Sequence, residues 1–350
     1  MLSSLYHFIT GTQDGVAGKV RQYRNMAYTT TVPATSSMPS GAPCVDGLTV
    51  DPVPSYAGSV GLIYIAVDDK GGEWCVKVAK PHIHERMQGE VAWMAAASAI
   101  SGMFNSTLPQ TIARTSEAFL QELDFLHEVR MWQRLNTSAE IQRSAYVDKS
   151  HVDVARSNSN QIVYRYVAGV PLSSPEILGK IPVTPLKNLI NCLLCMMHFE
   201  STVFADANAG NFIYNATTQT LTMIDYGAAS VLTESMKSFV KDIHFCGNDR
   251  KRLETCLEAR GSQILIQSIM PQINQFWNPS AIIFQSVKSS DVTLDTLTAA
   301  VDEGFEVVVR IMAQIVALLE YLQVCISTYE IMQYITDRYV NLEHNAPCSK

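Results

Sequence analysis

Two polar segments on either side of a short hairpin-like stretch constrain this sequence most. Asp206 and Asn211 lie five residues apart in the segment Asp-Ala-Asn-Ala-Gly-Asn, and Asp225 ends an apolar strand fourteen residues after Asn211. Gly and Asn favour tight turns, so three oxygen-bearing side chains are expected on two adjacent turns. Hard cations such as Mg²⁺ prefer oxygen ligands. The pattern predicts a metal–phosphate site; the structural alternative is a β-hairpin whose turns are merely rich in Asp, Asn and Gly.

Composition narrows the class of protein. The chain has 350 residues, of which 47% are hydrophobic and 17% charged, so it is globular and long enough for two lobes or domains. Its net charge is −7, and it contains no long run of Lys or Arg. We therefore expect no nucleic-acid partner.

Cysteines and apolar runs favour a reduced protein without a membrane span. Eight cysteines are scattered along the chain, which suits a reducing compartment. Cys192 and Cys195 have redox or zinc spacing, but they lie in an apolar helical run and are better explained by core packing. The longest apolar stretch, residues 311–326, contains Gln314 and other polar residues, so we expect a buried helix rather than a transmembrane span.

A small-residue turn and a strand lysine lie upstream. A turn that carries Ala57, Gly58, Ser59 and Gly61 would let backbone N–H groups approach phosphate oxygens. Lys77 lies inside the apolar strand Cys-Val-Lys-Val, where an ammonium needs an anionic partner. The alternative is a lysine that points to solvent from an edge strand.

Three acidic residues could supply that partner. Glu122, Asp124 and Glu128 fall within seven residues of a segment that is expected to be helical. Asp124 and Glu128 would share one helical face at spacing i, i+4. A solvated charged face is the alternative, but the apolar residues between the acids argue against full exposure.

These segments, in this order, resemble the UbiB family of atypical kinase-like proteins, also called ABC-one or ADCK kinases. The similarity runs from about residue 15 to 340, and residues 15–22 resemble the family's K-x-G-Q signature. The motif-bearing segments are residues 57–61, 75–81, 122–128, 206–211 and 224–227.

The resemblance implies an α+β, two-lobed protein-kinase-like fold with family-specific N-terminal helices, and ATP and Mg²⁺ as cofactors. It implies an N-terminal extension over residues 1–54, an N-lobe with a helical insertion over 55–168 and a helical C-lobe over 169–350. By this resemblance, Lys77 contacts the nucleotide phosphates with Glu128 as its partner, Asp206 is the catalytic residue, and Asn211 and Asp225 bind the metal. The turn of Ala57, Gly58, Ser59 and Gly61 covers the phosphates. Glu122 and Asp124 contact Lys19 and Gln22 of the signature.

Several positions depart from the family pattern. Arg21 replaces a Gly of the signature, Gly58 an Ala of the turn, and Leu62 a Gln. Ala207 replaces the Pro after the catalytic Asp, and Tyr226 replaces a Phe. None of these changes removes a phosphate or metal ligand.

The expected function is that of an atypical kinase or ATPase that binds Mg-ATP and supports isoprenoid quinone (coenzyme Q) biosynthesis rather than protein phosphorylation. A non-catalytic nucleotide-binding scaffold and a small-molecule phosphotransferase of the aminoglycoside or choline kinase type are the alternatives. Expected partners are nucleotide, an isoprenoid lipid or quinone-biosynthesis proteins, with peripheral membrane association. The expected compartment is mitochondrial, with a cytoplasmic alternative, although the first ten residues lack a secretory signal and no Arg precedes Arg21.

Overall fold

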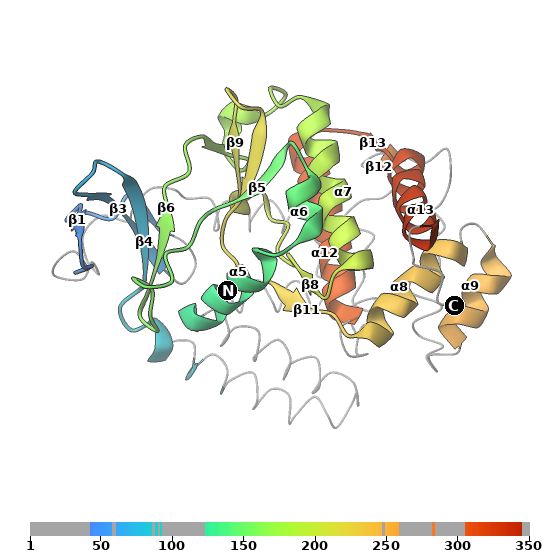
Figure 1. Ribbon diagram of the computed structural model, residues 1–350, viewed down its shortest axis with the longest axis horizontal. Helices are drawn as coiled ribbons and strands as arrows, with labels where there is room; N and C mark the ends of the chain where they lie inside the picture. The colour runs from blue at the N-terminus through green and yellow to red at the C-terminus, as the bar shows by residue number, and fades with distance from the viewer. Residues whose placement is uncertain are drawn as a thin grey trace, which may run out of the picture.

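The computed structural model describes residues 43–57, 61–85, 88–89, 92, 123–246, 249–258, 282–283 and 305–344. It contains both helices and strands, with a sheet at one end of the molecule and most helices at the other (Figure 1). The predictions for Lys19, Gln22, Gly58, Ser59 and Glu122, and the remark on Arg21, lie outside the described residues.

The first sheet is antiparallel and has the order β1-β3-β4-β6, with β2 paired to β3. An Asp68 carboxylate shapes the turn between β3 and β4, because its Oδ1 accepts hydrogen bonds from the backbone N–H groups of Lys70 and Gly72. The strands are β1 (Leu48–Val50), β2 (Tyr56–Ala57), β3 (Gly61–Asp68), β4 (Glu73–Ala79) and β6 (Gln161–Arg165).

The two faces of β4 serve different purposes. Trp74 and Val76 pack with Leu62, Tyr64 and other residues into a small core on one face of the sheet. Side chains alternate along a strand, so Lys77 points to the other face. Since β4 lies between β3 and β6, Lys77 is on a central strand, which excludes the edge-strand alternative.

A second sheet follows two short helices. Its order is β5-β10-β9-β7, in which β5 and β10 are parallel and the other pairs antiparallel. β8 pairs separately with β11. The elements are α5 (Phe125–Leu135), α6 (Ala139–Arg143), β5 (Val147–Lys149), β7 (Val170–Pro171), η1 (Pro175–Ile177), β8 (Thr202–Val203), η2 (Ala209–Asn211), β9 (Phe212–Asn215), β10 (Thr220–Met223) and β11 (Ser230–Val231).

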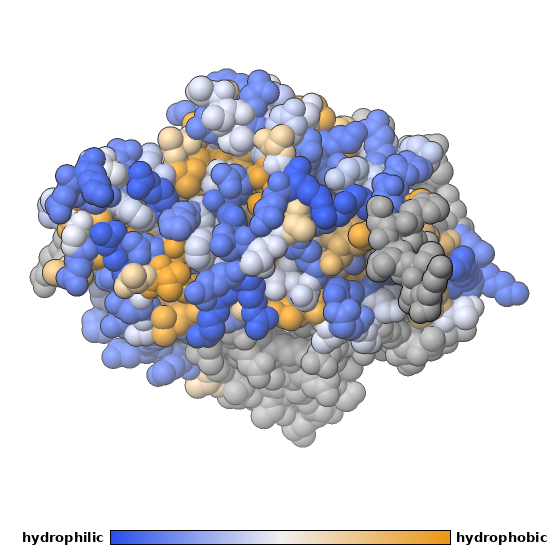
Figure 2. Space-filling view, viewed as in Figure 1, coloured by the Kyte–Doolittle hydropathy of each residue, from blue (hydrophilic) through white to orange (hydrophobic). Residues whose placement is uncertain are grey.

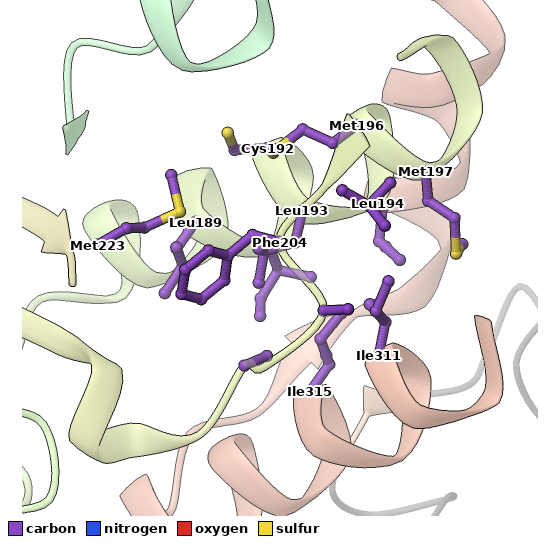
Figure 3. Close-up of a cluster of buried hydrophobic side chains, with 14 of the residues drawn as sticks. Leu189, Cys192, Leu193, Leu194, Met196, Met197, Phe204, Met223, Ile311 and Ile315 are labelled. Carbon is purple, nitrogen blue, oxygen red and sulfur yellow. The ribbon is translucent and has the colours of Figure 1, made fainter. Parts of the chain in front are cut away.

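The helical part is built around α7, which is buried on nearly every side. Figure 3 shows Leu193 and Leu194 of α7 near Ile311 and Ile315 of α12, with Phe204 in the same core. The elements are α7 (Val183–Phe199), α8 (Glu234–Cys246), α9 (Arg250–Glu258), α12 (Phe305–Leu322) and α13 (Thr328–His344), with β12 (Ile282–Ile283) paired to β13 (Ile326–Ser327).

The core packing predicted for Cys192 and Cys195 is confirmed, and the helix predicted over residues 311–326 is confirmed in part. Cys192 and Cys195 are 5% and 0% exposed within the α7 core, and burial raises the pKa of the Cys195 thiol to about 12, so it stays protonated. Residues 311–322 lie in the partly buried helix α12, but the helix ends at Leu322 and Ile326 begins β13, which pairs with β12. Among the described residues, no helix has the length and apolar character needed to cross a membrane. The face in Figure 2 is largely hydrophilic, with separate apolar patches.

Buried polar residues join the helices. Glu140 of α6 is 5% exposed and pairs with Arg143 of its own helix and with Arg338 of α13. Where α7, α8 and α13 meet, His198 Nδ1 and the Tyr339 hydroxyl are 3.1 Å apart.

His244 of α8 lies beside His198, with ring centroids 5.2 Å apart, and its Nε2 is 2.9 Å from the Thr336 hydroxyl. Burial lowers the pKa of His198 to about 3 and that of His244 to about 4. Both imidazoles are therefore neutral at pH 7.

Candidate active site

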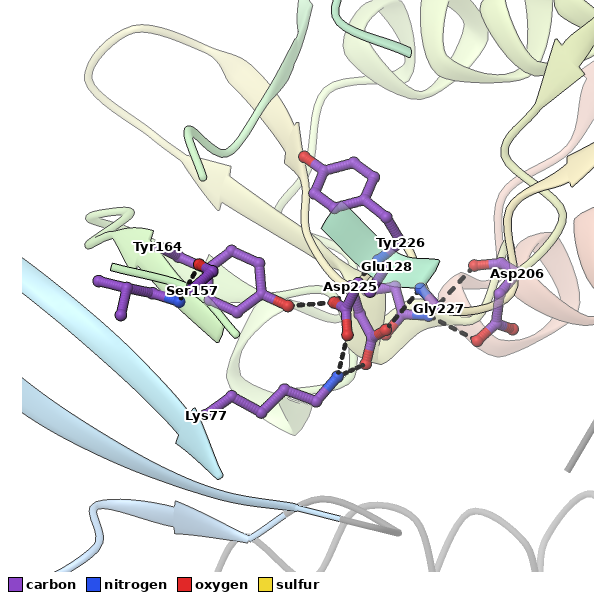
Figure 4. Close-up of polar contacts among 10 residues, drawn as sticks. Lys77, Glu128, Ser157, Tyr164, Asp206, Asp225, Tyr226 and Gly227 are labelled. Carbon is purple, nitrogen blue, oxygen red and sulfur yellow. Dashed lines mark hydrogen bonds and ion pairs between the residues drawn. The ribbon is translucent and has the colours of Figure 1, made fainter. Parts of the chain in front are cut away.

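Lys77 is the point at which the first sheet meets the rest of the molecule. Its Nζ lies 3.0 Å from Glu128 Oε2 and 2.9 Å from Asp225 Oδ2, and its side chain is 9% exposed (Figure 4). Burial acts to lower the pKa of Lys77, but the two carboxylates outweigh burial and raise it above the usual value. The lysine therefore remains a cation in this interior position.

Glu128 is held on several sides. It lies in the first turn of α5, where its Oε1 accepts hydrogen bonds from the Tyr164 hydroxyl and, at 3.1 Å, from the backbone N–H of Tyr226. Burial raises the pKa of Glu128 and the neighbouring Asp225 adds to this effect, against the opposing charge of Lys77. One ammonium therefore neutralises two nearby carboxylates.

Asp225 follows β10 and has a left-handed backbone conformation, with a φ of 62°. Aspartate tolerates this region better than most residues. Its Oδ1 accepts a hydrogen bond from the Gly227 N–H at 3.2 Å, and its side chain is 43% exposed. Burial acts to raise the pKa of Asp225, but the charge and hydrogen bond of Lys77, together with the hydrogen bond from the Gly227 N–H, lower it below its usual value, so the carboxylate is ionised.

Tyr226 explains why this turn accepts a residue other than Phe. Its ring is fully buried, and its hydroxyl donates to the Met223 carbonyl at 2.8 Å and lies 3.1 Å from Ser150 Oγ. A buried hydroxyl without such partners would be costly. The hydroxyl oxygen is thus accommodated inside the core by its hydrogen bonds.

Asp206 lies in the loop between β8 and β9 and is fixed from two directions. Asn211 Nδ2 donates to its Oδ2 at 2.7 Å, and Gln314 Nε2 donates to its Oδ1 at 2.7 Å. The Gln314 oxygen also accepts from the Ala207 N–H at 2.8 Å. The backbone N–H of Ile224 donates to the Asn211 carbonyl at 2.9 Å, which joins this loop to the strand that carries Asp225.

Gln314 is the site residue that sequence reasoning missed. It lies in α12, and the signal that could have found it is an amide between apolar residues of a mostly apolar helix. Burial raises the pKa of Asp206 and the Asp225 charge adds to this; the hydrogen bond from Gln314 acts in the opposite direction. Gln314 therefore both positions Asp206 and favours its ionised form.

The predicted metal ligands fit Mg²⁺ in kind. Asn211 uses its amide nitrogen on Asp206, which leaves its amide oxygen for a cation. Asp225 supplies a partly exposed carboxylate. Mg²⁺ takes one or two carboxylates plus phosphate and water rather than an all-protein cage. Within the described ranges, no group of three or more His, Cys, Asp or Glu residues could hold a metal ion.

One end of the predicted phosphate turn, Gly61, packs closely on the strand that carries Lys77. Ala57 ends β2 and Gly61 begins β3, paired with Ala79 of β4. A Cβ at Gly61 would lie 3.1 Å from the Val78 carbonyl oxygen and 3.2 Å from Lys77 Cγ. Glycine at this position therefore leaves room for the Lys77 side chain.

Asp124 does not join this cluster. The helix begins at Phe125, so Asp124 is the residue before its first turn, and the expectation that one helix includes both Asp124 and Glu128 is wrong. Its carboxylate pairs with Arg130 Nη2 at 2.8 Å. Because Lys19 and Gln22 lie outside the described residues, the proposed contact of Asp124 with them stays a prediction.

The chain has the fold of kinase-like proteins. A solved structure of Rv3197 from Mycobacterium tuberculosis, in complex with erythromycin, matches it with a TM-score of 0.57 over 95% of this chain and 90% of that chain, at 15% identity. The predicted α+β, kinase-like fold is thus confirmed.

Residues 48–255 match the ABC1 atypical kinase-like domain, and the chain belongs to this family. The atypical kinase COQ8, mitochondrial, of Saccharomyces cerevisiae is 23% identical over 194 residues, which are 53% of this chain. The match spans only 37% of that relative's length.

Proposed function

We propose that this protein binds Mg-ATP where Lys77, Asp225 and Asp206 meet and acts as an atypical kinase or ATPase. The observation that carries the proposal is the single buried cluster formed by Lys77, Glu128 and Asp225, joined through the Asn211–Ile224 hydrogen bond to the loop of Asp206. Phosphoryl transfer depends mainly on positioning and charge neutralisation, and this cluster provides both.

Each residue has a distinct proposed role. Lys77 binds nucleotide phosphates and exchanges its contact with Asp225 for them, while Glu128 holds the ammonium in place. The Asn211 amide oxygen and the Asp225 carboxylate bind Mg²⁺, which neutralises phosphate charge. Asp206 orients the nucleophile or accepts its proton.

The proposed phosphate-covering turn consists of Ala57, Gly58, Ser59 and Gly61. The observation that supports this role is the close approach of Gly61 to Lys77. Lys19, Gln22, Glu122 and Asp124 are proposed as the family-specific contacts on the nucleotide side. The proposed division into an N-terminal extension, an N-lobe to residue 168 and a C-lobe from residue 169 keeps the proposed nucleotide site at the junction of the last two.

We further propose support of isoprenoid quinone biosynthesis as the biological role, with a mitochondrial location. This part rests on the family and on the relative described as mitochondrial. A nucleotide-binding scaffold without turnover is the second candidate. It is favoured if the departures at Gly58 of the turn and at Arg21 disable turnover.

Binding is tested with Asp225→Asn, which keeps the left-handed backbone accessible and removes the charge. MgATP should raise the unfolding free energy of the wild type by about 2.7 kcal/mol at a hundredfold excess over its Kd, and the variant should lose most of this gain. Asp242→Asn, an exposed change on α8, is the matched control. If MgATP stabilised Asp225→Asn as much as the wild type, the proposed role of Asp225 as a Mg²⁺ ligand would be wrong.

Turnover and biological role need separate measurements. ATP hydrolysis that disappears in Asp206→Asn while MgADP binding remains would support the enzyme over the scaffold. Quinone profiles of cells that lack the protein, with rescue by wild type but not by Asp206→Asn, test the pathway. Normal quinone levels in those cells would contradict it.

A further inference from the structure

A second cation lies beside Asp206, on a helix outside the matched domain. Arg310 and Gln314 are four residues apart in α12, so they occupy the same face of the helix. That face covers the loop of Asp206, since Gln314 makes hydrogen bonds to both the Asp206 carboxylate and the Ala207 N–H. Arg310 is therefore placed one turn away from the contact that fixes Asp206.

The guanidinium of Arg310 retains an unused donor. Its Nε is buried, and no hydrogen-bond partner for it exists among the residues that the structure describes. An unsatisfied buried donor costs about 1–3 kcal/mol, so such a group next to a functional carboxylate indicates a place for a ligand acceptor. Its charge also acts on Asp206, whose pKa it lowers against the effects of burial and Asp225.

The charge balance of the site also calls for a cation here. Glu128, Asp225 and Asp206 are three carboxylates against one ammonium, Lys77. In Figure 4, Asp206 lies on the far side of Asp225 from Lys77. The loop of residues 206–211 contains no Lys or Arg. Phosphoryl transfer leaves negative charge on the transferred group next to the catalytic Asp, beyond the position of Lys77.

We propose that Arg310 binds a phosphoryl oxygen beside Asp206. This inference rests on the proposed Mg-ATP site and specifies its acceptor side. The phosphoryl group belongs to the γ-phosphate of the nucleotide or to a phosphate on the acceptor. A guanidinium suits either, because its planar fork can donate two parallel hydrogen bonds to phosphate oxygens.

The test compares Arg310→Gln and Arg310→Lys with wild type in the full chain. Calorimetry measures the Kd values of MgADP, of MgATP and of inorganic phosphate added to the MgADP complex. Arg252→Gln, an exposed change on α9, is the control for the loss of one positive charge. We expect MgADP binding to stay within about twofold in all variants, since Arg310 lies on the acceptor side.

If the γ-phosphate is the ligand, Arg310→Gln should lose about tenfold in MgATP affinity relative to MgADP. If an acceptor phosphate is the ligand, that ratio should stay constant and phosphate binding to the MgADP complex should weaken about tenfold. Arg310→Lys should fall between Arg310→Gln and wild type, because it keeps the charge without the fork.

Unchanged MgATP-to-MgADP ratio and unchanged phosphate binding in Arg310→Gln would overturn the role of Arg310 and leave the nucleotide site intact. A wild-type protein that binds neither MgADP nor MgATP would instead remove the proposed function, and this inference with it. Should Arg310→Gln fail to fold, Arg310→Lys decides: wild-type values for both measurements in that variant overturn the proposal.

Discussion

Lys77 donates to two carboxylates that would repel each other without it. At the scale of single residues, the contacts among Lys77, Glu128 and Asp225 define a pH range in which they stabilise the fold. The raised pKa of Lys77 means that its contribution is fully present below the usual value of 10.5 and is lost as pH rises through the folded pKa. The lowered pKa of Asp225 means that its contribution is present above 3.8 and is lost as pH falls through the folded pKa.

Removal of the ammonium should therefore be costly at neutral pH. We expect Lys77→Met to lower the free energy of unfolding by about 3–5 kcal/mol at pH 7, because it leaves the buried Glu128 carboxylate, next to the partly exposed Asp225, without a counter-charge. The loss should shrink at pH 4.5, where Glu128, whose pKa is already raised, becomes protonated. Urea unfolding at both pH values measures this, with the exposed Lys70→Met as control. An equal loss at the two pH values would contradict the repulsion argument.

The helix α12 shows what an element outside the motifs contributes. Gln314 anchors both the carboxylate of Asp206 and the backbone next to it. We expect Gln314→Leu to lower the catalytic rate roughly tenfold or more and to leave MgADP affinity unchanged. In this variant the acid limb of the plot of kcat against pH should move to higher pH, because the lost hydrogen bond is one that lowers the pKa of Asp206. Gln333→Leu, a change at an exposed position of α13, serves as the control. A lower rate in Gln314→Leu with an unshifted pH profile would show that Gln314 has only a structural role.

The junction of α7, α8 and α13 should make the fold sensitive to acid. His198 and His244 have lowered pKa values, so the unfolded chain binds more protons below pH 6.5 and stability falls as pH decreases towards 4. Tyr339 and Thr336 contact the two rings, and burial is the main cause of both lowered pKa values.

We expect the free energy of unfolding to drop by about 5 kcal/mol between pH 7 and pH 4.5, about half of it from each histidine. His244→Gln should flatten this dependence, because it removes one of the two titrating groups. Replacement of the exposed His82 by Gln is the control. Denaturant unfolding across this range gives the slope, and an unaltered slope in His244→Gln would show that other groups cause the acid sensitivity.

At the scale of the whole molecule, the matched domain ends before the helices that complete it. The family match stops at residue 255, yet α12 packs Ile311 and Ile315 against α7 and carries Gln314 to Asp206. We expect a chain that ends at residue 258 to lose cooperative urea unfolding and to bind the dye ANS, because the α7 face would be exposed. The full chain is the control. Cooperative unfolding of the shortened chain at the same midpoint would show that the C-terminal helices are dispensable.

The sequence predicts contacts within the motif-bearing segments better than contacts between those segments and the C-terminal helices. A lysine in an apolar strand demands an acidic partner, and the order of motifs points to Glu128, which the structure places at 3.0 Å. Gln314 and Asp206 are 108 residues apart, and an amide in an apolar helix predicts core packing equally well. The start of α5 at Phe125 rather than before Asp124 depends on one residue of helix boundary, which pattern alone does not determine. Local chemistry was thus predictable, and the tertiary support of Asp206 was not.

The parallel pairing of β5 with β10 has a consequence for how the protein is made. Its two strands are separated in the chain by β6, β7 and all of α7. Non-local pairings of this kind form slowly, because a long loop must close before they bring any gain. During synthesis, Asp225 cannot reach its folded position until β10 has left the ribosome. Asp206 lacks its hydrogen bond from Gln314 until α12 has been synthesised. The chain should therefore complete its proposed nucleotide site only once α12 has been synthesised, together with the core that α12 forms with α7.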